Sequence, residues 1–239
     1  MKALLLNLRL NSLYSINLPY TWQSALTYPI LPPSAIIGLL ANALQRYKND
    51  QPPNRYLEEI EEQVEWVGSR LLSPCITRSY IMSAITKWKA RLGDKFTNAL
   101  GRQFSYTRNI QIVSIFKNLP DSLIDAVISV PLTAGDSESA ISMEEMPVLK
   151  KVSRYKIIET QEIRTMFPLK FENKILSGEG KLYLMHEKCF KKEGKYFPLK
   201  TYLCPLKERK GIIYPTEITV SCNREDIIYK IEGVGFIIK

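Results

Sequence analysis

Cationic and aromatic side chains alternate in the stretch from residue 87 to residue 108, and their types suit contact with a nucleic acid. Lysine and arginine neutralise backbone phosphates and release counterions, while flat aromatic rings stack on unpaired bases. The basic residues are Lys87, Lys89, Arg91, Lys95, Arg102 and Arg108. The interleaved rings are those of Trp88, Phe96, Phe104 and Tyr106. The same pattern also permits a solvated loop with a few buried aromatic anchors.

The excess positive charge of the chain is concentrated around this stretch. The 239 residues include 33 lysines and arginines against 24 aspartates and glutamates, and the formal net charge is +9. Between Ile76 and Asn118 the only acidic residue is Asp94, against eight basic residues. A basic balance favours a polyanionic partner over an acidic small molecule. Many proteins are nevertheless mildly basic without binding nucleic acid.

A rigid turn leads into a predicted helix between Tyr28 and Gly38. Prolines at positions 29, 32 and 33 hold the chain extended and bias each preceding residue away from helical dihedrals, so we expect the helix to begin after the last of them. Ser34 is then the predicted N-cap, with its hydroxyl accepting an amide hydrogen of the first turn. Apolar residues recur at helical spacing from Ile36 to Tyr47.

The start of this helix is a second candidate site for a nucleic acid. The amides and the positive dipole end of a helix N-terminus suit a phosphate, and the nearby rings of Trp22 and Tyr28 would add stacking. Gly38 costs about 1 kcal/mol relative to alanine inside a helix, which indicates the close approach of a sheet or a phosphate. The alternatives are an ordinary capped helix and aromatic residues that belong to the core.

Two motifs, in this order, resemble the signature of the CRISPR-associated (Cas) protein family five. The first comprises Thr27-Tyr28-Pro29, Pro32-Pro33-Ser34 and Gly38 after a leucine-alternating strand. The second, Leu132-Thr133-Ala134-Gly135-Asp136-Ser137-Glu138-Ser139, resembles the glycine-serine-glutamate segment of that family. On the residues alone, Gly135 with Ser137 either lets the backbone approach a phosphate or forms a simple turn.

The resemblance implies a non-catalytic subunit of a type I CRISPR surveillance (Cascade) complex in antiviral defence, of the archaeal I-A kind. Such a subunit binds the 5′ handle of the guide RNA (crRNA) and caps the filament of backbone subunits. The expected partners are crRNA and the backbone and large subunits, with target DNA reached only through the assembly. In the expected mechanism, residues 87–108 act as a thumb over the RNA, while the helix start and the Gly135 loop position its phosphates. We expect neither a cofactor nor a metal.

Two other functions remain open at this stage. Some members of the resembled family cleave repeat RNA with a tyrosine and an adjacent lysine-histidine pair, but His186 is the only histidine here and no Lys-His pair occurs. A metal-independent repeat-RNA endonuclease nevertheless remains the first alternative function. The second is a purely protein-interacting subunit of the same assembly. The motifs of phosphate loops, dinucleotide-binding folds, serine hydrolases and zinc proteases are absent from the sequence.

The spacing of apolar residues predicts an α+β fold with two parts. Residues 1–153 are expected to form a ferredoxin-like (RRM-like) domain, with the basic stretch near 87–108 as an insertion. The resemblance implies the same fold, which is that of the repeat-associated RNA-binding superfamily. A smaller, mostly antiparallel β region is expected over residues 154–239. The predicted elements of the first part are a strand at 3–10, helices at 34–47 and 55–72, strands at 75–86 and 109–116, a short helix ending near 127 and a strand at 140–152.

The remaining features exclude several classes of protein. No apolar run approaches the roughly 18 residues of a membrane span, and Asn7 and Arg9 interrupt the apolar start of the chain, so we expect a cytoplasmic protein. The four cysteines are widely spaced and lack a CxxC pair, which argues against a zinc site or a disulfide framework. We expect them to be packing residues.

Overall fold

The computed structural model describes residues 1–21, 24–88, 95–135, 139–172, 174–189 and 199–239, and for residues 24, 82–88, 95–100 and 174 it describes the backbone alone. Over these residues the chain is a mixed α+β protein, with three helices and mostly antiparallel strands. The predicted fold class is confirmed at this level. None of the described helices combines the length and apolarity needed to cross a bilayer.

The largest sheet has eight strands and is organised around β1 (Lys2–Leu10). One edge of β1 pairs along its length with β6 (Asn109–Phe116), which in turn pairs with β3 (Val64–Leu71). The other edge is shared by β8 (Ala140–Met143) and β9 (Val148–Tyr155), which occupy the single strand predicted at 140–152. β7 (Leu132–Thr133) pairs with β8, and β18 (Ile228–Ile231) and β19 (Gly235–Ile238) extend the sheet beyond β9.

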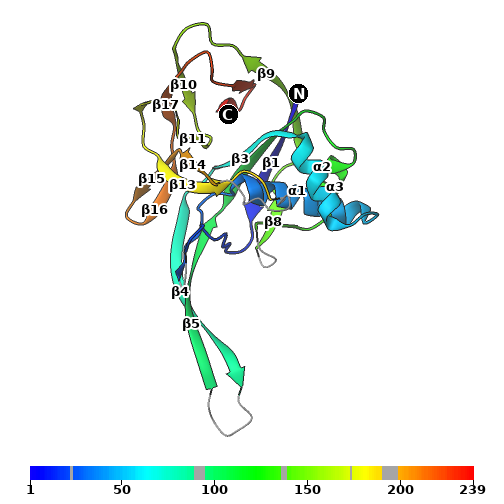
Figure 1. The fold of residues 1–239 in the computed structure, drawn as a ribbon, viewed down its shortest axis with the longest axis vertical. Coiled ribbons are helices and arrows are strands. Elements are labelled where there is room, and N and C mark those ends of the chain that lie inside the picture. The colour runs from blue at the N-terminus through cyan, green and yellow to red at the C-terminus, as the bar shows by residue number, and fades with distance from the viewer. Residues whose placement is uncertain (22–23, 89–94, 136–138, 173, 190–198) are drawn as a thin grey trace.

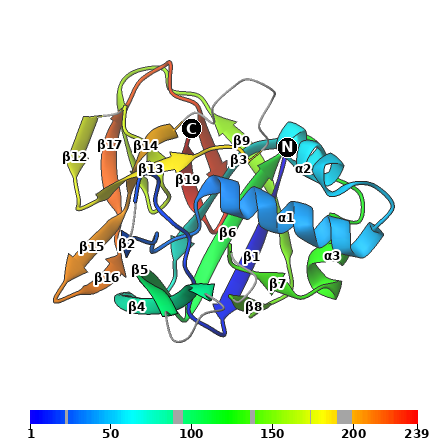
Figure 2. The same ribbon diagram turned by 60° about the horizontal axis from the view of Figure 1, so that its bottom comes forward.

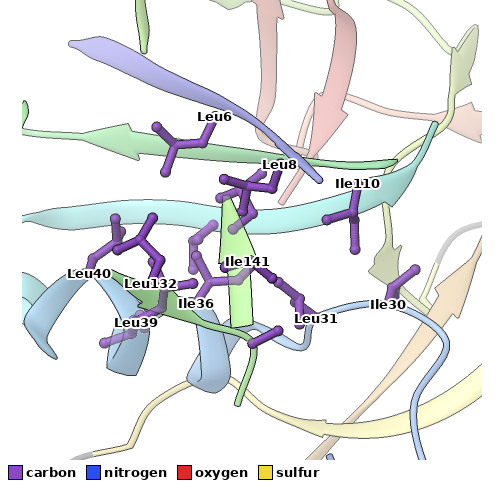
Figure 3. Packing of buried hydrophobic residues seen from close by; sticks show 14 of the residues in the cluster. Leu6, Leu8, Ile30, Leu31, Ile36, Leu39, Leu40, Ile110, Leu132 and Ile141 are labelled. Atoms are coloured by element: carbon purple, nitrogen blue, oxygen red, sulfur yellow. The ribbon is translucent and has the colours of Figure 1, made fainter. Parts of the chain in front are cut away.

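Three helices cover one face of this sheet: α1 (Pro33–Lys48), α2 (Pro53–Gln63) and α3 (Leu123–Ser129) (Figure 2). The alternation of leucines in β1 directs Leu4, Leu6, Leu8 and Leu10 into the core beneath them. Figure 3 shows Leu6 and Leu8 facing Ile36 and Leu40 of α1. The predicted inner face of β1 and the predicted inner face of the first helix therefore pack against each other.

The first helix starts one residue earlier than the sequence predicted. Pro32 is the N-cap and Pro33 is the first helical residue, with no side-chain hydrogen bond capping the helix. Ser34 is therefore not the N-cap, and that prediction was wrong. The physical reason is that the first helical position has no use for an amide hydrogen and favours the fixed φ of proline, so Pro33 can begin the helix itself.

The helix predicted at 55–72 was also wrong in its second half. Helix α2 ends at Gln63, and β3 begins at the next residue. Residues 66–69 of β3 are all buried because the strand is covered on both faces, so its sequence shows no alternation. Its apolar residues happen to continue the three-and-four spacing of the preceding helix, which produced the error.

A long hairpin projects from the body of the molecule (Figure 1). It consists of β4 (Cys75–Trp88) and β5 (Lys95–Thr107), and we call it the arm. The strand predicted at 75–86 exists, but it pairs with β5 rather than with β6, because β3 occupies the edge of β6. At its base the arm is flanked by β2 (Ser24–Ala25) on one side and by the hairpin of β15 (Leu206–Arg209) and β16 (Ile212–Pro215) on the other.

The C-terminal part is rich in short antiparallel strands, as predicted for residues 154–239. β10 (Gln161–Thr165), β17 (Ile218–Cys222) and β12 (Lys174–Ser177) form one three-stranded sheet. β11 (Leu169–Lys170), β14 (Leu199–Cys204) and β13 (Lys181–His186) form another. The boundary predicted at residue 153 falls within β9, and β18 pairs with that strand on both sides of it.

Candidate nucleic-acid interface

One face of the arm's base carries a compact group of cationic and aromatic side chains. Directly opposed residues of an antiparallel pair point to the same face, and the face repeats every second residue. The register opposes Ile76 with Tyr106, Arg78 with Phe104, and Tyr80 with Arg102. These six residues therefore form three consecutive rows on one face, which we call the arm face.

The rings of the arm face are accessible. Tyr80 is 48% exposed, Tyr106 is 42% exposed and Ile76 is 39% exposed. Arg78 is exposed as well, while Arg102 and Phe104 are half-buried. Large exposed rings beside arginines are the groups that stack on bases and neutralise phosphates of a single strand.

Phe104 is the centre of the arm face. The ring of Tyr80 meets it edge-on, with the two centroids 5.7 Å apart and the ring planes at 71°. The guanidinium carbon of Arg102 lies 4.9 Å from its centroid, and Nε of Arg102 donates to Oγ of Ser15 at 3.1 Å. Aromatic and cation–π contacts of this kind hold side chains in fixed geometry, so the face is ordered before any ligand arrives.

The edge of β5 at the base of the arm is braced by the loop that runs from β1 to α1, which we call the bracing loop. Tyr14 exchanges two backbone hydrogen bonds with Ser105 of β5, at 2.9 and 2.8 Å. The side chain of Gln103 accepts from the amide of Thr27 at 3.1 Å, and the hydroxyl of Ser15 donates to the carbonyl of Gln103 at 2.9 Å. Tyr14 is fully buried, and this burial raises the pKa of its hydroxyl, which donates to the carbonyl of Pro29 at 2.5 Å. The base of the arm is thus fixed to the body.

The structure places the residues predicted in the basic stretch in three groups. Arg102 and Tyr106 lie on the arm face, and Arg108 is exposed just after β5. Lys87, Trp88 and Lys95 lie in the strands farther along the arm, where only the backbone is described. Outside the described residues lie Lys89 and Arg91, together with the two other candidates Trp22 and Ser137.

Tyr28 does not belong to an exposed surface. It is 2% exposed, its hydroxyl donates to the carbonyl of Leu184, and its ring lies 5.8 Å from that of Tyr183. Burial raises the pKa of its hydroxyl. The ring is part of the packing between the N-terminal loop and β13, so it offers no face to a base.

The start of α1 is covered by the C-terminal part of the chain. The thiol of Cys189 donates to the carbonyl of Ser34 at 3.1 Å, and its amide donates to the carboxylate of Glu61 at 2.5 Å. Burial raises the pKa of the Cys189 thiol to about 12. Gly38 lies one turn farther along and is half-buried, but a Cβ placed on it would meet no described atom within 4 Å. Among the described residues, nothing therefore approaches Gly38 closely in the direction in which a side chain would point.

Gly135, by contrast, lies against the loop that braces the base of the arm. Its φ is +90°, and an added Cβ would lie 2.5 Å from Cγ1 of Ile16 in the bracing loop. The same turn is tied to that loop by Ser139, whose hydroxyl donates to the carbonyl of Leu13 at 3.1 Å. Of the two predicted phosphate-positioning elements, the Gly135 turn therefore contacts the bracing loop, and α1 packs against β13.

Sequence analysis did not select Ile76, Arg78 and Tyr80 as site residues. They precede the dense basic stretch, and their place on the arm face depends on the register between β4 and β5. The signal that would have found them is the alternation of a hydrophobic, a basic and an aromatic residue at positions 76, 78 and 80.

A separate cavity of about 460 Å³ lies along the outer edge of β3, and Lys117, Tyr202 and Glu187 are among its lining residues. Four glutamates and four lysines line it, so its formal charges balance. Lys170 is paired with Glu187 at 3.2 Å, and Lys239 is paired with Glu65 at 2.5 Å. Because the lining has no net positive charge, the cavity suits an anionic ligand less well than the arm face does.

The fold and the arm face together define a class: a mixed α+β protein with a projecting hairpin whose base presents cations and rings on one side. Residues 5–117, just under half of the chain, match the family model described as CRISPR-associated protein (Cas_Cas5). The matched segment contains the first of the two motifs from which the resemblance was inferred, Thr27 to Gly38, and agrees with it there. The match includes most of β1, all of α1, both strands of the arm and the arm face.

A solved structure shares the fold over the whole length of the chain. A crystal structure of a CRISPR protein from Archaeoglobus fulgidus is similar over 100% of this chain and 98% of that chain, with a TM-score of 0.65 and 15% sequence identity. A chain of a CRISPR RNA-guided surveillance complex has a TM-score of 0.49 at 14% identity, covering 91% of each chain. A chain of a type III-B Cmr-beta complex bound to cognate target RNA and AMPPnP has a TM-score of 0.48 at 11% identity, covering 92% of this chain and 86% of that chain. No curated protein sequence matches the chain.

Proposed function

We propose that this chain is a non-catalytic subunit of a type I CRISPR surveillance complex and that it binds the 5′ handle of crRNA through the arm face. The observation that carries the proposal is the set of three opposed pairs at the base of the arm, with exposed rings and arginines in alternate rows. The match of residues 5–117 to the Cas5 family supports the same assembly. The archaeal I-A subtype is part of the proposal, as are crRNA and the backbone and large subunits as partners.

The order of the central strands supports a ferredoxin-like core. β1 is followed by α1 and α2, then by β3 and β6, then by α3, and finally by β8 and β9. In space, β8 and β9 lie on one side of β1, and β6 then β3 lie on the other. A strand order of 4-1-3-2 with the helices on one face corresponds to the split βαβ arrangement. We propose that the arm is an insertion between the second and third strands of this core.

In the proposed mechanism, the arm face holds an unpaired strand by two kinds of contact. Arg78 and Arg102 neutralise phosphates, which contributes affinity that falls with salt. Tyr80 and Tyr106 stack on bases, which tolerates several base types. At the Gly135 turn no side chain projects from the glycine, so the backbone there can come close to the RNA strand where the RNA leaves the arm.

The proposal is tested by fluorescence anisotropy with the full chain and a labelled single-stranded RNA of the CRISPR repeat's 5′ handle. Arg78→Ala should weaken binding and reduce the log-log salt slope by about 0.7, the value for one phosphate contact to a single strand. Arg78→Lys should restore the slope. Lys151→Ala, which removes the same charge from exposed β9, is the matched control and should bind as the unchanged chain does. Equal binding by Arg78→Ala and Lys151→Ala would remove the arm face from the proposal.

The endonuclease alternative has its own outcome in the same samples. His186 is half-buried at the end of β13, opposite Leu199. Under the proposal, incubation with repeat RNA leaves the RNA intact. Metal-independent cleavage that disappears in His186→Ala would replace the proposal by the endonuclease, and full RNA binding by an arm-face variant inside an intact complex would favour a protein-interacting subunit.

A further inference from the structure

The arm face continues across two more strands that come from the C-terminal part of the chain. β16 pairs with the base of β4, and Ile212 lies opposite Ile76. On its other edge β16 pairs with β15, and Arg209 lies opposite Ile212. One row of four directly opposed residues therefore crosses four strands: Arg209, Ile212, Ile76 and Tyr106. Because opposed residues share a face, Arg209 points to the same side as the arm face.

The neighbouring row repeats the chemistry of the arm face. Lys207 lies opposite Tyr214, two residues from Arg209 and Ile212 respectively, and so shares their face. Tyr214 is 37% exposed, and Arg209 is exposed. The turn of this hairpin also lies beside the arm, since a Cβ on Gly211 would be 3.8 Å from Nη1 of Arg78. The hairpin thus adds two cations and a ring to the sheet beside the base of β4.

We propose that the β15–β16 hairpin is part of the same RNA site, with Lys207 and Arg209 binding phosphates and Tyr214 stacking on a base. This inference rests on the proposed function of the arm face. The four strands span three inter-strand spacings, roughly 14 Å, so the RNA crosses the sheet from β5 to β15 instead of following the arm alone. The site is consequently built from segments more than a hundred residues apart.

Glu179 competes with the RNA for these two cations. Its carboxylate lies 3.1 Å from Nζ of Lys207 and 4.0 Å from Nη2 of Arg209, and its side chain is 59% exposed. Such an exposed ion pair is weak and can be exchanged for a phosphate. The carboxylate therefore lowers the affinity of the hairpin for any anion, and an RNA strand that is already held by the arm face displaces it.

The inference is tested with the full chain and the labelled repeat RNA. Lys207→Ala and Arg209→Ala should each weaken binding several-fold and lower the salt slope by about 0.7. Glu179→Gln should strengthen binding at low salt by about fivefold, the factor for one unit-charge interaction at 4 Å in water. Lys151→Ala serves as the control for loss of a distant exposed charge. All substituted side chains lie at the surface, and melting curves verify that each variant is folded.

The outcomes separate this inference from the proposed function. If Arg78→Ala weakens binding while Lys207→Ala and Arg209→Ala behave as Lys151→Ala, the hairpin is not part of the site and the arm face stands. If the unchanged chain binds no RNA, both are overturned. If Glu179→Gln binds RNA with unchanged affinity while Lys207→Ala binds more weakly, only the proposed competition by the Glu179 carboxylate is overturned.

Discussion

The guanidinium carbon of Arg102 lies 4.9 Å from the centroid of the Phe104 ring, on the face of β5 that also presents Tyr106. Arg102 also donates a hydrogen bond to Ser15 of the bracing loop. Its side chain is therefore held in place by two groups, the Phe104 ring and the Ser15 hydroxyl. A cation fixed in this way loses little rotamer entropy on binding a phosphate. The arm face is therefore preorganised, and its individual side chains have separable effects.

Tyr106 should contribute stacking and not charge. We expect Tyr106→Ala to weaken RNA binding by about 1–3 kcal/mol, roughly 5- to 150-fold in Kd, with the salt slope unchanged. Tyr106→Phe keeps the ring and should bind nearly as the unchanged chain does. Anisotropy titrations at three salt concentrations measure both quantities. A loss in Tyr106→Ala that is accompanied by a smaller salt slope would show that the residue acts through phosphate contacts.

The two glycines that sequence analysis singled out should respond in opposite ways to alanine. Gly135→Ala places a Cβ 2.5 Å from Cγ1 of Ile16 and forces a side chain onto a φ of +90°, which should cost about 1–3 kcal/mol of stability. Gly38→Ala meets no described atom within 4 Å inside α1 and should stabilise by up to about 1 kcal/mol. Urea unfolding of the two variants measures the difference. Equal destabilisation by both would contradict the open space at Gly38.

Much of the fold was predictable because several elements show one clear period. The leucines of β1 alternate, the apolar residues of α1 follow helical spacing, and β6 is a short, mostly apolar run rich in isoleucine. These elements were placed within a residue or two. Their burial is local in origin, since each element buries the face that its own sequence displays.

Other elements were not predictable because their environment is set by distant parts of the chain. In β3, Trp66 and Val67 point to opposite faces and both are buried, so no alternation marks the strand. The site shows the same limit. The basic stretch identified the arm, but Arg78 joins Phe104 only through the register of β4 and β5, and Arg209 joins them only through β16. Sequence analysis assigned Tyr28 to the RNA site. Its burial could not be predicted, because Leu184, whose carbonyl accepts a hydrogen bond from the Tyr28 hydroxyl, is far along the chain.

Arg70 should hold the C-terminal strands to the main sheet. Its guanidinium lies 4.7 Å from the centroid of Phe167, and its nitrogens donate to Gln111 of β6 at 2.9 Å and to the carbonyl of Val234 at 3.3 Å. Burial lowers the pKa of this guanidinium from its usual value. We expect Arg70→Ala to cost about 1–3 kcal/mol, since acceptors in a half-buried site lose their donor. Arg70→Lys should recover little, because a lysine lacks the planar fork. Denaturant unfolding measures both variants, and equal stability of all three proteins would contradict this role.

Glu65 should make the attachment of the last strands sensitive to acid. Burial alone would raise the pKa of its carboxyl, but hydrogen bonds from Lys239 at 2.5 Å and from the hydroxyl of Tyr229 at 2.8 Å outweigh burial and lower the pKa below its usual 4.5. A carboxyl whose pKa is lower in the folded state stabilises that state fully above the unfolded pKa, and the contribution is lost as pH falls through the folded pKa. Stability should therefore decline below about pH 4.5 partly through this residue.

The variant Glu65→Gln isolates that contribution. At pH 7 it should melt below the unchanged chain, because the glutamine side chain carries no charge to attract Lys239. As the pH falls from 5 to 3, the difference in Tm should shrink, since the carboxyl of the unchanged chain becomes protonated and loses the same interaction. Lys239→Met removes the partner of Glu65 and should show the same convergence. Glu225→Gln is the control, because the side chain of Glu225 is exposed and the hydrogen bond of this residue is made by its backbone amide. The Tm of this control should follow that of the unchanged chain at every pH. A difference between Glu65→Gln and the unchanged chain that stays constant down to pH 3 would mean that shape, and not charge, accounts for the effect of Glu65.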